Sequence, residues 1–152
     1  MTGYPADSPA GTAGGLDAIF PASLAVPARV RSLLRFRLLE WRMREIVDDV
    51  LLIADELVAN AVQSTPDRDI HVRFRRAVTV VEFAVWDSSA ELPVLRPVVE
   101  MTLDDVLPDP CALEPGRADG GRGLHIVRAL ASDCGVRKTE PTGKWVWAAI
   151  AL

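Results

Sequence analysis

The segment from Arg44 to Thr65 constrains the fold more than any other part of the sequence. Its apolar residues recur at the spacing of one helix face, and a helix with such a stripe must bury it against another element. The stripe consists of Ile46, Val50, Ala54, Leu57 and Ala61. Pro66 stops the pattern, because proline breaks a helix interior. We therefore predict one long amphipathic helix that packs on a core.

Strand-like runs on the C-terminal side of this helix predict the layer that it covers. Residues 70–75 and 78–86 are rich in β-branched and aromatic side chains, and the short link between them favours an antiparallel pair. Residues 135–140 and 144–152 predict a closing hairpin, with its turn at residues 141–143.

The N-terminal side adds a strand and a helix. Residues 16–26 suggest a strand, which Pro21 restricts to the edge of a sheet, because proline cannot donate to a strand ladder. Pro27 opens a helix that continues to Trp41, and residues 124–131 predict a third helix. Three helices and about five strands, segregated along the chain, predict an α+β fold. We expect a two-layer α/β sandwich, whose mixed, mostly antiparallel sheet is covered by the three helices.

Length and composition place these elements in one domain. We expect a disordered tail over residues 1–15, which are rich in Ala, Pro, Gly, Ser and Thr, and a single domain over residues 16–152. A net charge of −4 argues against direct nucleic-acid binding, since phosphate contacts need clustered Lys and Arg. The two cysteines are too few for a disulfide framework, and no segment is apolar enough to span a membrane. We expect a cytoplasmic protein.

Two polar residues of the long helix are the first candidates for chemistry. Glu56 and Asn60 are four residues apart and share a face at the margin of the apolar stripe, where the wall of a pocket would lie. A carboxylate can act as a general base, and a carboxamide oxygen is a suitable ligand for magnesium. The alternative is an exposed polar pair, which is common on amphipathic helices.

Asp87 is the second candidate, because it ends the apolar run from Val80 to Trp86. A carboxylate at a strand end can accept a hydrogen bond from an amino group such as that of adenine. Asp87, Ser88 and Ser89 can equally form a plain turn, since Asp and Ser favour turns by bonding their own backbone.

A glycine run before the third predicted helix is the third candidate. Gly120, Gly121 and Gly123 allow the backbone to approach a ligand closely, and the free N–H groups of the helix start can face a phosphate. The alternative is a flexible helix entry. The run is not a dinucleotide-binding fingerprint, because Ile126 stands where that motif has its third glycine.

The order of these groups resembles the ATPase superfamily of gyrase, the heat-shock chaperone and histidine kinases. Within it, the chain is most similar to the small anti-sigma-factor serine kinases, in the form abundant in actinobacteria. The matching residues are Glu56 and Asn60 of the N box, Asp87 of the first glycine box, and Gly121, Arg122, Gly123 and Leu124 of the second. The segment from Gly143 to Ala148 resembles the closing strand. The resemblance begins at Phe20, reaches the C-terminus and implies the Bergerat-type, histidine-kinase-like ATPase fold.

The resemblance implies ATP and Mg²⁺ as cofactors and a role for each residue of the N box and the first glycine box. Glu56 would be the general base that polarises a serine hydroxyl or a water. Asn60 would ligate Mg²⁺, and Asp87 would bind the adenine amino group. Phosphoryl transfer needs mostly positioning and charge neutralisation, so few side chains suffice.

The second glycine box is expected to hold the phosphates. Gly121 and Gly123 would give backbone amides to them beneath a mobile lid over residues 94–119, which is rich in proline. Arg122 and Leu124 belong to the same box, and we expect them to contact the nucleotide as well.

The resemblance also implies a function and partners. The leading hypothesis is an ATP-dependent serine kinase, a homodimer, that sequesters a sigma factor and phosphorylates an anti-anti-sigma protein. Ser89 would contact the nucleotide, but it stands where the family usually has glycine, and its Cβ can crowd the base or restrict φ. This motivates a second hypothesis, a partner-switching binding module that is catalytically weak or free of nucleotide.

Arginines of the first predicted helix offer a docking surface for such a partner. Arg31, Arg35 and Arg42 share one face in the predicted helix, which can bind an acidic segment of a sigma factor. The alternative is a solvated helix face.

Overall fold

The structure is a computed structural model in which residues 14–91 and 122–152 are described. Its elements are, in chain order, β1 (Leu16–Pro21), α1 (Val26–Glu40), the 3-10 turn η1 (Arg44–Ile46), α2 (Val47–Ser64), β2 (Asp69–Arg76), β3 (Val80–Asp87), α3 (Arg122–Leu130), β4 (Asp133–Lys138) and β5 (Lys144–Ala151). The predicted lid over residues 94–119 and residues 1–13 of the predicted tail lie outside the described residues. Of the described helices, none is long and apolar enough to cross a membrane.

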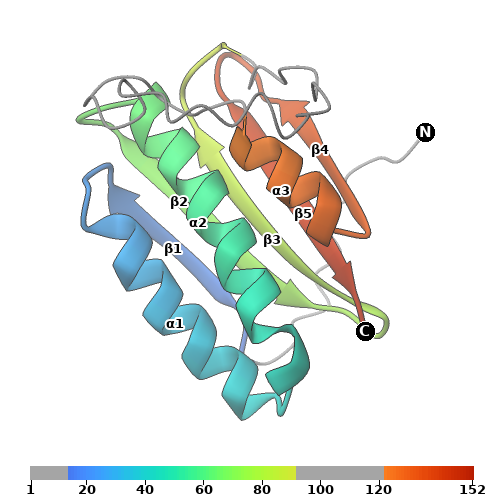
Figure 1. The fold of residues 1–152 in the computed structure, drawn as a ribbon. Coiled ribbons are helices and arrows are strands. Elements are labelled where there is room, and N and C mark those ends of the chain that lie inside the picture. The colour runs from blue at the N-terminus through green and yellow to red at the C-terminus, as the bar shows by residue number, and fades with distance from the viewer. Residues whose placement is uncertain (1–13, 92–121) are drawn as a thin grey trace, which may run out of the picture.

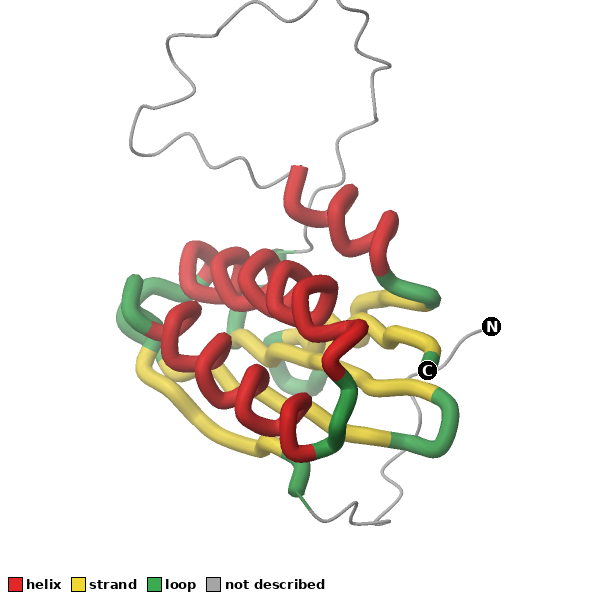
Figure 2. The backbone as a smooth tube through the Cα atoms, turned by 60° about the horizontal axis from the view of Figure 1, so that its bottom comes forward, coloured by secondary structure: helices red, strands yellow, loops and turns green. Residues whose placement is uncertain are grey.

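The strands form one sheet in the order β1-β2-β3-β5-β4, and each described ladder is antiparallel. The helices lie together on one face of this sheet, so the structure has two layers (Figures 1 and 2). The predicted α+β sandwich is therefore confirmed. The parallel pair that a mixed sheet requires is not found among the described strands. β3 and β4 run in the same direction, but β5 is inserted between them and pairs antiparallel with both.

Alternation along the two central strands assigns each side chain to one face of the sheet. Val85 of β3 and Val146 of β5 belong to the main core beneath the helices. Trp145 belongs to a second apolar cluster, on the opposite face. Because residues two apart share a face, Asp87 and Lys144 both lie on the helix side, at the end of the main core.

The long helix predicted over residues 44–65 begins differently in the structure. Its first residues form η1, and α2 starts at Val47. Arg42 has a φ of 58°, which turns the chain between α1 and η1. At the other end the prediction holds, since α2 ends at Ser64, two residues before Pro66.

The edge position predicted for the first strand is confirmed. β1 lies at one edge of the sheet beside β2, and Pro21 is its last residue. The strand is shorter than predicted, because α1 already begins at Val26. Pro27 lies in the first turn of α1, where its missing N–H has no partner to lose.

Of the three arginines predicted to share one face of the first helix, Arg31 and Arg35 lie four residues apart within α1 and share a face, but Arg42 does not. α1 ends at Glu40, so Arg42 lies beyond the helix and helical spacing no longer relates it to Arg31. Arg31 bonds Asp55 of α2 over 2.8 Å, and Arg35 is exposed. The prediction of a shared face is therefore wrong for Arg42, because α1 ends before it and the chain turns at Arg42 itself.

Candidate functional site

Three element ends converge at one end of the described structure. In Figure 1 the C-terminal end of α2, the end of β3 and the start of α3 all lie at the top of the view. α2 packs against both β3 and α3. The fold therefore brings the elements that carry the N box, the first glycine box and the second glycine box to one edge of the two layers.

Glu56 and Asn60 lie half-buried on α2. Asp55 marks the side of α2 that faces α1, because it bonds Arg31. At roughly 100° per residue, Glu56 and Asn60 lie about 100° and about 140° round the helix from Asp55. Helical spacing therefore places both residues off the side of α2 that faces α1, and α3 is another helix that packs on α2.

Two buried polar atoms near this end have no hydrogen-bond partner among the described residues. One is the amide nitrogen of Asn60, and the other is the hydroxyl oxygen of Ser88, which directly follows β3. A buried polar group without a partner costs about 1–3 kcal/mol, so proteins retain few of them. The amide nitrogen of Asn60 fits a ligand with acceptor oxygens, such as phosphate, while the Oδ1 of Asn60 suits Mg²⁺.

Asp87 ends β3 with its carboxylate almost completely buried. Its Oδ1 accepts a hydrogen bond from Lys144 Nζ over 2.7 Å, and only 3% of the Asp87 side chain and 4% of the Lys144 side chain are exposed. The two residues lie directly opposite each other in the ladder of β3 with β5. An ionised carboxylate only accepts hydrogen bonds, so Asp87 fits an amino group such as that of adenine.

Lys144 is not among the residues predicted for this site, although it contacts Asp87. The resemblance of the segment from Gly143 to Ala148 to the closing strand gives this lysine no role. The available signal was a single cation at the start of a strand that is otherwise apolar from Trp145 to Ile150. Its contact with Asp87 could not be inferred without the strand pairing.

Ser89 holds Asp87 in place. Its backbone N–H donates to Asp87 Oδ1 over 2.9 Å, and its hydroxyl accepts a hydrogen bond from the N–H of Glu91 over 3.1 Å. In the described ranges, Arg42 and Asp67 are the non-glycine residues with positive φ, so Ser89 does not need glycine's freedom. The residues after β3 thus form a turn. Because the hydrogen bond from this turn to Asp87 uses Oδ1, the turn does not occupy Oδ2, the oxygen that a ligand would need.

The start of α3 carries the second glycine box. Gly121 lies outside the described residues, and α3 begins at Arg122. The phosphate contacts expected of Gly121 and Gly123, and the nucleotide contact expected of Arg122, therefore stay predictions. Leu124 is buried in the main core, where it anchors α3, and its contact with a nucleotide stays a prediction too.

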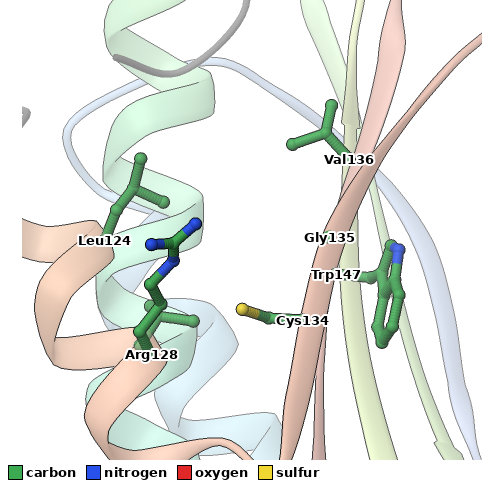
Figure 3. A pocket seen from close by; sticks show the side chains of 7 residues that line it. Leu124, Arg128, Cys134, Gly135, Val136 and Trp147 are labelled. Atoms are coloured by element: carbon green, nitrogen blue, oxygen red, sulfur yellow. The ribbon is translucent and has the colours of Figure 1, made fainter. Parts of the chain in front are cut away.

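A separate cavity of about 100 Å³ lies between α3 and β4 (Figure 3). Its mostly apolar lining consists of Leu124, Val127, Arg128, Cys134, Gly135, Val136 and Trp147. The thiol of Cys134 points toward α3 in Figure 3. Of the described residues named for the predicted site, Leu124 alone lines this cavity, so the cavity is distinct from the region of Asp87 and Asn60.

The described residues form a two-layer α/β sandwich, and one edge of it carries the groups predicted for nucleotide binding. Residues 21–150 match the family described as the histidine kinase-like ATPase domain. The match covers most of the sequence, and the chain belongs to this family. A comparison with curated proteins gives no significant match. The superfamily predicted from the order of the boxes is confirmed, and nucleotide binding is the general function that follows from it.

Proposed function

We propose that this domain is an ATP-dependent serine kinase of the anti-sigma-factor type. It would act in the cytoplasm, phosphorylate an anti-anti-sigma protein and sequester a sigma factor. The proposal depends on two groups on elements that meet at one end of the fold. One is the buried amide nitrogen of Asn60, which has no hydrogen-bond partner among the described residues, and the other is the buried carboxylate of Asp87. Asn60 suits Mg²⁺ and phosphate and Asp87 suits an adenine amino group, so each end of ATP has a matching residue.

Glu56 completes the proposed reaction as the general base. The serine hydroxyl oxygen of the antagonist attacks the γ-phosphorus of ATP, the bond from that phosphorus to the β–γ bridging oxygen breaks, and ADP leaves. The proton of the hydroxyl passes to the Glu56 carboxylate. Glu56 and Asn60 share a face of α2 about one turn apart, so the base and the metal ligand are directed to the same site. Mg²⁺ supplies charge neutralisation on the phosphates when it is bound.

Two measurements test this proposal. Isothermal titration calorimetry with ATP and Mg²⁺ should show binding to the purified chain. Radiolabelled ATP should then transfer its γ-phosphate to a serine of an anti-anti-sigma protein that the chain binds. Binding of ATP without labelling of any bound antagonist would contradict the kinase assignment.

A partner-switching binding module is the second candidate, and the ion pair of Asp87 favours it. The carboxylate expected to bind adenine already has an internal cation 2.7 Å away. Such a module would bind the sigma factor and its antagonist without phosphoryl transfer. Glu56→Ala separates the two candidates, because a kinase loses transfer and keeps partner binding, whereas a binding module is unchanged in both assays. Gln63→Ala, at an exposed position of the same helix, is the matched control.

The homodimer implied by the anti-sigma resemblance is part of the proposal. Light scattering after gel filtration should give about twice the chain mass of 16.5 kDa. A mass of one chain at micromolar concentration would remove the dimer from the proposal and leave the kinase assignment unaffected.

A further inference from the structure

Lys144 is a buried cation at the edge of the candidate nucleotide site. Only 4% of its side chain is exposed, and its Nζ donates to Asp87 Oδ1 over 2.7 Å. An ammonium group has three N–H donors and no acceptor. The described part of the chain supplies the one acceptor at Asp87, and a buried donor without a partner is costly. The remaining donors of Lys144 therefore call for an acceptor from a ligand.

The arrangement around Asp87 gives this acceptor a place. Among residues 14–91 and 122–152, the hydrogen bonds to the Asp87 carboxylate come from Lys144 and from the Ser89 N–H, and both use Oδ1, which leaves Oδ2 to accept from an incoming donor. Asp87 and Lys144 are opposite residues of neighbouring strands, and both side chains lie on the helix side of the sheet. A ligand that reaches this end of the fold meets an acceptor directly beside a donor.

We propose that Lys144 reads the nucleobase together with Asp87. Lys144 Nζ donates to ring nitrogen N1 of adenine, while Asp87 Oδ2 accepts a hydrogen bond from the neighbouring 6-amino group. Guanine in the same pose would present O6 to the carboxylate and N1–H to the ammonium, so both contacts would become repulsive. Lys144 is thus a specificity-determining residue for adenine, and this inference rests on the proposed nucleotide binding.

A purely structural role for Lys144 makes a different prediction. If Lys144 served only to neutralise Asp87, the pair would affect stability and leave the choice of base unchanged. A site that donates a hydrogen bond to the base instead rejects an analogue that lacks the acceptor, because the buried donor is then left unpaired. An analogue without N1 as acceptor therefore separates the two roles.

The test compares ATP with 1-deaza-ATP, in which C–H replaces N1, by calorimetry on the full chain with Mg²⁺. The wild type should bind 1-deaza-ATP roughly 10- to 100-fold more weakly than ATP, the range expected for a hydrogen bond from a charged donor. Lys144→Met should bind both nucleotides with similar affinity, and Lys144→Arg should retain part of the discrimination. Lys138→Met is the matched control, because Lys138 is the exposed residue opposite Lys144 in β4, and it should keep the wild-type ratio.

The outcomes distinguish this inference from the proposed function. Equal affinity of the wild type for ATP and 1-deaza-ATP overturns the role of Lys144 and leaves nucleotide binding intact. A wild type that binds neither nucleotide contradicts the proposed function and, with it, this inference. Circular dichroism checks that Lys144→Met folds. If that variant does not fold, the wild-type ratio and Lys144→Arg decide the question by themselves.

Discussion

Asp87, the last residue of β3, and Lys144, the first residue of β5, form an ion pair in which both side chains are buried. Their side chains are 3% and 4% exposed, whereas those of the pair Arg31 and Asp55 are 44% and 30% exposed. Removing one partner of a buried pair leaves an uncompensated buried charge, while an exposed pair contributes little. Because the two ion pairs differ in burial, the stability losses of variants at the two pairs can be compared directly.

Asp87→Asn should destabilise the fold by about 3–5 kcal/mol, because it leaves the Lys144 ammonium without its counter-charge. The double variant Asp87→Leu/Lys144→Met should recover much of that loss, since it removes both charges. Asp55→Ala on the exposed pair should cost about 1 kcal/mol or less. Urea unfolding measures all three, and equal losses for Asp87→Asn and Asp55→Ala would contradict the burial of the ion pair.

Glu56→Gln should separate phosphoryl transfer from nucleotide binding. The amide keeps the size of the side chain but cannot accept the serine proton, and general-base catalysis contributes about 10²- to 10⁴-fold in rate. We expect single-turnover transfer to fall within this range, with the Kd for ATP and Mg²⁺ nearly unchanged. A variant with the wild-type rate would show that another group takes the proton.

Asn60→Leu should remove the effect of Mg²⁺ on ATP binding without destabilising the fold. Leucine has a similar size and removes a buried amide nitrogen that has no hydrogen-bond partner among the described residues. We expect stability to be unchanged or higher by about 1 kcal/mol, and the increase in ATP affinity on addition of Mg²⁺ to disappear. Thermal unfolding and Mg²⁺ titrations measure the two effects. A large loss of stability would indicate that the amide is needed by the fold itself.

Gly143→Ala should disrupt the turn beside Asp87. Gly143 has a φ of 90°, and a Cβ there would lie 2.5 Å from the Trp86 ring and 2.7 Å from the Asp87 carbonyl oxygen. The strained backbone and the overlap should together cost about 2–4 kcal/mol. Gly135→Ala is the control, because its Cβ would meet the Trp147 ring at 3.1 Å without a positive φ, and it should cost less. Thermal unfolding tests this prediction, because Gly143→Ala should have a lower melting temperature than Gly135→Ala.

The interactions of Asp17 on β1 with His71 and Arg73 on β2 should make a pH-dependent contribution to stability. Burial raises the pKa of Asp17, but the hydrogen bond with His71 and the charges of His71, Arg73 and Arg75 outweigh burial and hold this pKa below its ordinary value of 3.8. A carboxyl with a lowered folded-state pKa contributes stability that is complete above its unfolded value and is lost as the pH falls through the folded value. The Asp17 side chain is 56% exposed, so the contribution should stay below about 1 kcal/mol.

Asp17→Asn should therefore lower the melting temperature near neutral pH, and its difference from the wild type should shrink as the pH falls below about 4. Melting curves at a series of pH values measure this. A difference that grows toward low pH would have the wrong sign and would contradict this contribution of Asp17.

Local patterns sufficed for much of the fold. The apolar spacing of α2 predicted the helix, the position of Pro66 predicted its C-terminal end, and Pro21 predicted the edge position of β1. The errors fell where the chain turns. Arg42 adopts a positive φ that its residue type does not favour, so the start of α2 and the placement of Arg42 on one face with Arg31 and Arg35 were predicted wrongly.

By itself the sequence determined the elements and the chemical groups that they carry: Glu56 and Asn60 one helical turn apart, and Asp87 at the end of a strand. These follow from helix and strand periodicity, which is a property of the local backbone. Only the tertiary structure decided that Lys144, 57 residues away, lies opposite Asp87 and is buried with it. Strand order depends on which strands pair across the sheet to bury the core, and no local spacing encodes that choice.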